Sequence, residues 1–204
     1  MHKEVLSDNQ SKLLPFISTF SKDYYLVGGT AIALQIGHRQ SHDFDLFTKN
    51  KIKPGTIKNK LKARNIEYKT IHQESDQLHI LINDVKITYF NYPYEISANL
   101  QFENIIKMVE LIDLAAMKAF AFGGRAKWKD YVDMYFLLKK YFSLTQIENK
   151  AKEIFKGAFN PKLFRQQMAY FTYIDYSESV IFMMEKPEEN EIKLFLTDIA
   201  TQSF

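Results

Sequence analysis

Two aspartates separated by one residue are the part of this sequence best suited to chemistry. Asp43 and Asp45 stand in the run His-Asp-Phe-Asp-Leu-Phe, which has the composition of a short strand. Successive side chains of a strand point to opposite faces, so the two carboxylates share one face. Adjacent carboxylates repel each other, and a divalent cation is the usual compensation because Mg²⁺ prefers hard oxygen ligands. The pair predicts a metal site, with two solvent-facing acids on an edge strand as the alternative.

A glycine turn precedes the aspartates. Gly28 and Gly29 follow a short apolar run, and Thr30 begins a predicted helix. Glycines let the backbone turn tightly and approach a ligand without a Cβ in the way. The first turn of a helix presents unpaired N–H groups and a partial positive charge to an anion. The turn and the two acids together could hold a triphosphate and its metal, which is the minimum needed to transfer a nucleotide.

The loop before the aspartates adds polar side chains. Arg39 could bind a phosphate through two parallel hydrogen bonds, although a loop arginine is often only solvated. His38 and His42 have no evident partner, and the histidines do not have the spacing of a zinc site. The residues predicted to bind the nucleotide phosphates are Gly28, Gly29, Thr30, Arg39 and Ser41.

This pattern resembles the nucleotidyltransferase superfamily, whose signature is a strand, a Gly-Gly or Gly-Ser turn, a helix and an Asp-x-Asp strand. Residues 26–34, Leu-Val-Gly-Gly-Thr-Ala-Ile-Ala-Leu, and residues 37–47, Gly-His-Arg-x-Ser-x-Asp-Phe-Asp-Leu-Phe, are similar to the AbiEii/AbiGii-type toxin nucleotidyltransferases. A second block is similar to the later motifs of that family. It comprises Asp-Leu-Ala-Ala-Met-Lys at 113–118 and Arg-x-Lys-x-Lys-Asp-x-x-Asp-x-Tyr-x-Leu-Leu at 125–138.

The resemblance implies the reactants and two further catalytic residues. Mg²⁺, or Mn²⁺ in its place, would bind Asp43 and Asp45, and an NTP would be the substrate. Lys118 would pair with a triphosphate oxygen, and Asp130 would act as a catalytic or metal-linked acid. Asp133 shares the helix face of Asp130 and is interpreted as a cap or ion-pair residue. The alternative for all three is a salt-bridge set between two helices.

One departure from the wider superfamily concerns a third carboxylate. Many nucleotidyltransferases place it on a later strand, but the run Val-Lys-Ile-Thr-Tyr-Phe at 85–90 contains no acid, and Thr88 occupies the expected position. A threonine is no general base near neutral pH. Two hypotheses stay open: a base elsewhere, or a catalytically degenerate protein of this fold that binds nucleotides or partners.

The periodicity of the chain predicts an α+β protein. Predicted strands occupy residues 24–27, 43–48, 67–72, 78–82 and 85–90, with an extended piece near 105–109. Predicted helices occupy residues 8–20, 30–36, a segment from 54, a segment that Gly123-Gly124 ends, and then 131–141, 144–155, 161–174 and 189–199. We expect a nucleotidyltransferase-type mixed sheet with flanking helices over residues 1–100. A mostly helical domain over 101–204, a C-terminal helical bundle, would contribute to the active-site cleft.

Composition bears on the acceptor and on the cellular location of the protein. The net charge of +3 is mildly basic, and lysines concentrate at 49–69 and 125–129, which favours RNA unless they are simply solvated helix faces. The absence of cysteine, of a signal-peptide core and of a long apolar segment predicts a cytoplasmic protein with no membrane contact. The resemblance implies a type IV-like toxin with an RNA acceptor, tRNA foremost, or a protein acceptor, and a cognate antitoxin.

Overall fold

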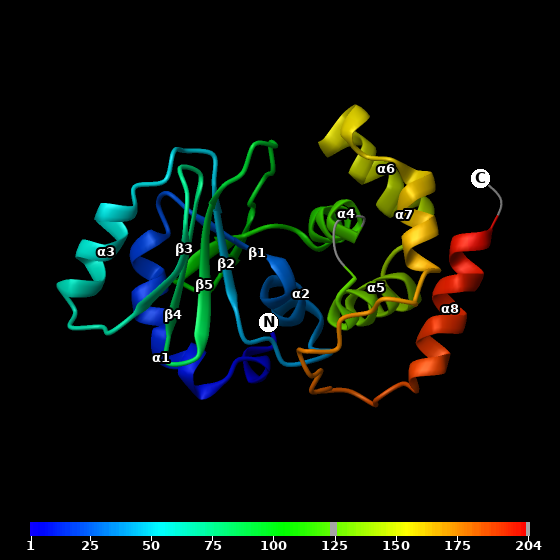
Figure 1. Ribbon diagram of the computed structural model, residues 1–204, viewed down its shortest axis with the longest axis horizontal. Helices are drawn as coiled ribbons and strands as arrows, with labels where there is room; N and C mark the ends of the chain where they lie inside the picture. Colours follow the sequence, from blue (N-terminus) through cyan, green and yellow to red (C-terminus); the bar gives the residue numbers. More distant parts are fainter. Residues whose placement is uncertain (123–125, 203–204) are drawn as a thin grey trace. The chain divides into compact units, whose positions relative to one another are not determined.

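The computed structural model describes residues 1–122 and 126–202, so the predicted helix stop at Gly123-Gly124, and Arg125, lie outside the described residues. The chain divides into two compact units, Met1–Glu110 and Leu111–Phe204. Within the described ranges, all the strands belong to the first unit, and the second unit is helical (Figure 1).

The first unit is built on a mixed sheet. Its strands are β1 (Tyr25–Val27), β2 (Phe44–Thr48), β3 (Lys69–Gln73), β4 (Gln77–Ile82), β5 (Val85–Asn91), β6 (Leu100–Phe102) and β7 (Ile106–Met108). In the described part of the chain they form one sheet in the order β3-β4-β5-β2-β1-β7-β6. The β2–β5 and β1–β7 pairs are parallel and the others antiparallel. The predicted α+β class is confirmed, with β6 as a strand that the sequence pattern did not reveal.

Local sequence signals explain where the helices of this unit begin and end. They are α1 (Asp8–Ile17), α2 (Gly28–Ile36) and α3 (Pro54–Lys62), with short 3-10 turns at Lys3–Val5 and Ser18–Phe20. Ser7 caps α1 in a capping box with Gln10, and Pro54 occupies the first turn of α3, where its missing N–H does no harm. Gly37 ends α2 in the left-handed conformation with φ of 68°.

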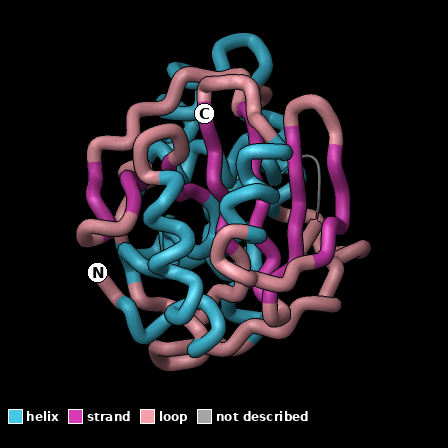
Figure 2. The backbone as a smooth tube through the Cα atoms, turned by 90° about the vertical axis from the view of Figure 1, so that its left-hand side faces the viewer, coloured by secondary structure: helices cyan, strands magenta, loops and turns pink. Residues whose placement is uncertain are grey.

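The sheet of this unit has one buried and one half-exposed face near its centre. Phe44 and Leu46 of β2 are fully buried, whereas Asp45 and Phe47 between them are intermediate in exposure. Helices α1 and α3 lie along the buried face (Figures 1 and 2). There the ring of Tyr89 packs 5.0 Å from that of Phe20. Hydrophobic packing therefore fixes which face of β2 carries its aspartates.

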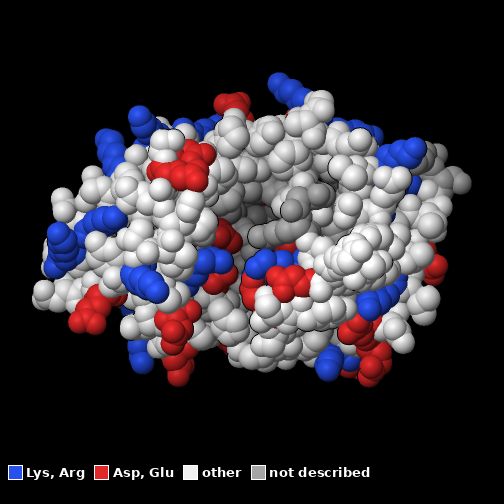
Figure 3. Space-filling view, in the orientation of Figure 1, with Lys and Arg blue, Asp and Glu red and all other residues white. Residues whose placement is uncertain are grey.

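Two details of the first unit match the sequence pattern. Asn83 and Asp84 have φ of 46° and 65°, which are the left-handed values that a two-residue hairpin turn requires, and they join the antiparallel strands β4 and β5. Basic side chains gather over α3 (Figure 3). On α3 itself, Lys58 bonds Gln73 and Lys60 bonds the carbonyl of Thr19, so both have structural contacts.

The second unit consists of packed helices. They are α4 (Leu111–Phe122), α5 (Trp128–Lys140), α6 (Leu144–Phe155), α7 (Pro161–Met168) and α8 (Glu189–Thr201), with a 3-10 turn at Lys156–Ala158. The rings of Phe120 and Phe155 stack with centroids 4.1 Å apart and join α4 to α6. The predicted helix over 161–174 ends early, at Met168. The carbonyl of Tyr170 instead accepts a hydrogen bond from the Tyr131 hydroxyl, and an irregular segment follows.

Candidate active site

Strand pairing places Asp45 beside the glycine turn. Asp45 lies opposite Val27, the last residue of β1, in the antiparallel β1–β2 pair. Since α2 begins at the next residue, Gly28, the carboxylate of Asp45 lies where the chain leaves the sheet and enters the helix. The two sequence features that the prediction joined are therefore neighbours in space.

The side chain of Asp45 approaches Gly28 so closely that a residue with a Cβ at position 28 would collide with it. Gly28 has φ of +76°, and a Cβ built on it would lie 2.1 Å from Asp45 Oδ2. A Cβ on Gly29 would lie 2.6 Å from Arg39 Nη2. The two glycines thus admit a carboxylate and a guanidinium to the start of α2, where backbone N–H groups attract anions.

The loop between α2 and β2 is held from inside the first unit. Thr30 Oγ1 lies 2.8 Å from Ser41 Oγ and also bonds the main-chain carbonyl of Asp43. Gln10 Nε2 donates to the same carbonyl at 3.3 Å. Arg39 is buried and donates to the Gln40 carbonyl at 2.8 Å. The hydroxyls of Thr30 and Ser41 position Asp43, and their predicted contact with phosphate stays a prediction.

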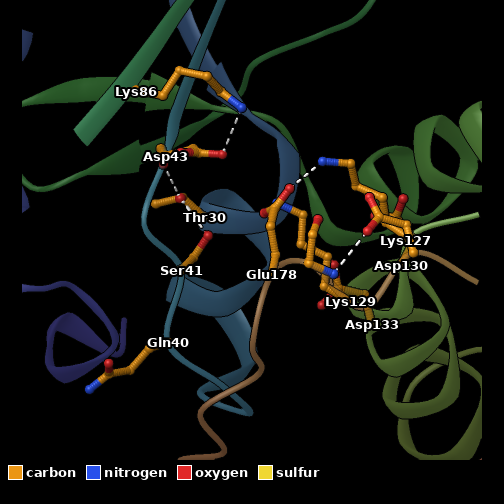
Figure 4. Close-up of polar contacts among 12 residues, drawn as sticks. Thr30, Gln40, Ser41, Asp43, Lys86, Lys127, Lys129, Asp130, Asp133 and Glu178 are labelled. Carbon is orange, nitrogen blue, oxygen red and sulfur yellow. Dashed lines mark hydrogen bonds and ion pairs between the residues drawn. The ribbon is translucent and has the colours of Figure 1, made fainter. Parts of the chain in front are cut away.

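A lysine that the sequence analysis passed over contacts the first aspartate. Lys86 Nζ lies 3.0 Å from Asp43 Oδ2, and the two side chains point toward each other (Figure 4). The β2–β5 pair aligns Phe44 with Ile87 and Asp45 with Thr88, so Asp43 and Lys86 precede matching positions on the same face. The alternation of side chains along β5 predicts that Lys86 and Thr88 share a face. It does not predict that Asp43 is the partner of Lys86, because that contact depends on the pairing of β5 with β2.

Two histidines extend this polar face across the sheet. Thr88 stands beside Asp45 on one side and opposite His79 of β4 on the other. His79 in turn stands opposite His72, with ring centroids 5.3 Å apart. Burial lowers the pKa of His79, and the charges of His72 and Lys86 lower it further against the opposing charges of Asp45 and Glu74. The position expected for a third acid thus has a hydroxyl, and the imidazole beside it has a lowered pKa.

The donor set suits a hard divalent cation. In residues 1–122 and 126–202, acids and histidines do not gather in threes around a common point. Asp45 lies in β2 and Asp43 two residues before it, both are intermediate in exposure, and Gly28 leaves room for the Asp45 carboxylate at the helix start. Two carboxylates completed by phosphate and water oxygens are a usual magnesium arrangement. The residues present therefore fit Mg²⁺ bound together with a nucleotide.

The second unit buries its predicted site residues in one ion-pair cluster. Lys118 Nζ of α4 lies 2.7 Å from Asp130 Oδ1 and 2.6 Å from Asp133 Oδ2, both on α5. The three side chains are 6%, 2% and 0% exposed, respectively. This is the geometry of the salt-bridge set considered as the alternative, and the catalytic role of Lys118 and Asp130 stays a prediction.

A second ionic cluster of this unit was missed. Lys127 and Lys129, at the start of α5, both bond the carboxylate of Glu178 (Figure 4). Burial raises the pKa of Glu178, but the hydrogen bonds from both lysines outweigh it and bring the pKa to about 2. Backbone hydrogen bonds of Asp175 with residues 126 and 128 hold the segment that carries Glu178. The sequence shows Lys127 and Lys129 close together, but it does not predict that Glu178 is their partner.

The fold itself defines the class of protein. MenT4, a nucleotidyltransferase toxin from Mycobacterium tuberculosis H37Rv, has a similar structure, with a TM-score of 0.62 over 94% of this chain and 80% of that chain at 12% identity. JHP933 from Helicobacter pylori gives a TM-score of 0.58 over 96% of this chain and 91% of that chain at 19% identity. The chain therefore has the nucleotidyltransferase fold.

The sequence comparisons identify the family. Residues 16–198 match the family described as "Nucleotidyl transferase AbiEii toxin, Type IV TA system". The chain belongs to this family and is a nucleotidyltransferase, as its motifs predicted. An uncharacterized protein of Aquifex aeolicus (strain VF5), aq_aa25, is 31% identical over 141 residues, which are 66% of this chain and 68% of that protein.

Among the helices in the described part of the chain, none combines the length and the apolar character that a membrane crossing requires.

Proposed function

We propose that this enzyme transfers a nucleoside monophosphate from an NTP to RNA, tRNA foremost, and is the toxin of a toxin–antitoxin pair. Mg²⁺ would bind at Asp43 and Asp45, with Mn²⁺ able to replace it. The observation that supports this most strongly is the contact of the Asp45 carboxylate with Gly28, at the start of α2. Metal ligands and a helix N-terminus then face one triphosphate.

The proposed reaction balances without a further reactant. The acceptor hydroxyl oxygen forms a bond to the α-phosphorus, the bond from that phosphorus to the bridging oxygen breaks, and pyrophosphate leaves. The proton of the hydroxyl passes to a base or to water. A bound divalent cation supplies neutralising positive charge for the triphosphate and the leaving pyrophosphate.

The residues of the first unit have separate tasks in this proposal. Asp43 and Asp45 hold the metal, and the N–H groups at Gly28 and Gly29 bind phosphate oxygens. Arg39, whose guanidinium lies against Gly29, adds positive charge at the same turn. Electrostatic groups that are fixed before the reaction need no reorganisation when charge moves to the leaving group.

The role of the helical unit is proposed separately. The family resemblance assigns Lys118 and Asp130 to catalysis, and we propose that the helical domain contributes them to nucleotide transfer. Their burial within one ion-pair cluster means that simple replacement also removes a structural interaction. A test of their role therefore needs variants in which the loss of one charge is compensated by the loss of its partners' charges.

An RNA acceptor in the cytoplasm, and an antitoxin partner, complete the proposal. The family description names a type IV toxin–antitoxin system. The exposed Lys62 and Arg64, at and just beyond the end of α3, add to the basic surface of the first unit and favour a polyanionic acceptor over a neutral one.

The test compares two aspartate variants. Wild-type enzyme is incubated with each labelled NTP, Mg²⁺ and total cellular RNA, and the labelled product is sized. Asp45→Asn keeps the shape of the side chain but removes a metal ligand, so we expect transfer to fall by about 10³-fold or more with the fold intact. Asp84→Asn changes an exposed turn aspartate by the same chemistry and should transfer at the wild-type rate.

Each other outcome is informative. Full activity of Asp45→Asn would refute the metal-binding assignment. If the label appeared in the protein fraction and not in RNA, the acceptor would be a protein and the proposed RNA acceptor would be wrong. Mg²⁺-dependent NTP binding by the wild-type protein without transfer to either pool would favour a nucleotide-binding protein that has lost catalysis.

A further inference from the structure

The charge around the two aspartates differs from that of a three-carboxylate site. Asp43 and Asp45 contribute two negative charges, Thr88 contributes none, and Lys86 contributes one positive charge through its contact with Asp43. These four side chains therefore sum to one negative charge. A divalent cation added to it without nucleotide produces a net positive site, whereas a metal–triphosphate complex adds negative charge.

Lys86 also bonds a carboxylate oxygen of Asp43 that could otherwise coordinate the metal ion. Its Nζ lies 3.0 Å from Asp43 Oδ2, a hydrogen-bonded ion pair in which the lysine is 35% and the aspartate 22% exposed. A cation that binds Asp43 must use the other oxygen beside an ammonium group or displace that group from Oδ2. Both routes weaken the binding of the metal alone, because like charges repel at short range.

The same lysine is placed to favour the nucleotide complex. It projects from β5 on the face that carries Asp45, and its carbon chain is long enough for the ammonium to turn from Oδ2 toward a phosphate oxygen beside Asp43. A lysine serves as a point charge for phosphate without a fixed geometry. The interaction it gives up with Asp43 would then be replaced by one with the triphosphate.

We propose that Lys86 makes metal binding depend on nucleotide: it competes with the divalent cation for Asp43 and pairs with the triphosphate when the two bind together. The inference rests on the proposed metal site at Asp43 and Asp45. It assigns Lys86 a role in substrate binding that a purely structural ion pair would not have.

Two binding measurements with opposite expected directions test the proposal. Titration calorimetry with Mn²⁺ alone should show about ten-fold tighter binding to Lys86→Met than to wild type. With saturating Mn²⁺, a non-hydrolysable NTP analogue should bind Lys86→Met about ten-fold more weakly. Methionine keeps the length of the side chain, and thermal unfolding checks that the variant is folded.

The matched control is Lys49→Met, which removes another lysine of the first unit from an ion pair, that with Glu95 at 3.2 Å. It makes the same change in net charge and should alter neither affinity. Unchanged or weaker Mn²⁺ binding by Lys86→Met would overturn the inference, as would equal effects in the two lysine variants.

Asp43→Asn separates this inference from the proposed function. It should weaken Mn²⁺ binding if Asp43 is a ligand. If it does so while Lys86→Met changes nothing, only the role of Lys86 is refuted. If Asp43→Asn leaves Mn²⁺ affinity at the wild-type value, the metal site itself is refuted and the inference falls with it.

Discussion

Replacing Gly28 by alanine should damage the active site more than it damages the fold. The added Cβ would lie 2.1 Å from Asp45 Oδ2 and 3.0 Å from its Cγ. An ordinary contact requires about 3.5 Å, so the carboxylate must withdraw by about 1.4 Å. A misplacement of about 1 Å in a catalytic group can reduce the rate by about 10²-fold. We therefore expect Gly28→Ala to lose about 10²-fold in nucleotide transfer and to bind Mn²⁺ more weakly.

The stability effect of this change is smaller and can be controlled. Gly28 has φ of +76°, and an L-residue in the left-handed region costs about 1–2 kcal/mol. Gly37 has φ of +68°, and its Cβ would meet the side chain of His2, whose Nδ1 would be 2.6 Å away. Gly37→Ala therefore carries a similar backbone strain without touching an aspartate.

The assay measures urea unfolding, Mn²⁺ affinity and transfer rate for both alanine variants. Both should lose about 1–2 kcal/mol of unfolding free energy. Gly28→Ala alone should lose metal affinity and activity. Wild-type activity in Gly28→Ala, or the same loss of activity in Gly37→Ala, would refute the argument that the close approach to Asp45 matters for chemistry.

Two further predictions concern the ionic clusters of the helical unit. Lys118→Met leaves Asp130 and Asp133 buried without their cation and should lower the unfolding free energy by about 3–5 kcal/mol. Adding Asp130→Asn and Asp133→Asn should restore most of it in urea titrations, and recovery of transfer in that triple variant would contradict direct catalytic roles for Lys118 and Asp130. The pKa of Glu178 in the folded protein is about 2, below its usual 4.5, so its stabilising contribution is complete above about pH 4.5 and disappears as pH falls toward 2. Glu178→Gln should lower stability at pH 7 by about 1 kcal/mol, since the group is partly exposed, and should flatten the acid limb of the stability–pH curve; an unchanged acid limb would contradict this.

The elements around the aspartates could be predicted because their signals are local. The apolar run before Gly28, the glycine turn and the alternation in β2 each depend on adjacent residues. Strands β1 and β2 form as expected and Gly28 has a positive φ, but α2 begins at Gly28 and not at Thr30, so the two glycines are its first residues. The end of α7 at Met168 could not be predicted, because the carbonyl of Tyr170 just beyond it bonds the hydroxyl of Tyr131, 39 residues from Tyr170. Strand β6 is three residues long and is defined only by its pairing with β7.

In the candidate site, too, the residues with local sequence signals could be predicted and those placed by long-range contacts could not. The residue types of Asp43 and Asp45 pointed to a metal, and strand alternation placed them on one face. Lys86 was missed because its importance comes from the parallel register of β2 and β5, which no local pattern encodes. Glu178 was missed because its lysine partners lie 51 and 49 residues away.

The side chain of Gln10 links the first helix to the residue that precedes β2, Asp43. Its Oε1 accepts from the Ser7 amide at the start of α1, and its Nε2 donates to the Asp43 carbonyl. A substitution of this glutamine removes both hydrogen bonds at once, so it perturbs the start of α1 together with the backbone of Asp43, although Gln10 and Asp43 lie 33 positions apart.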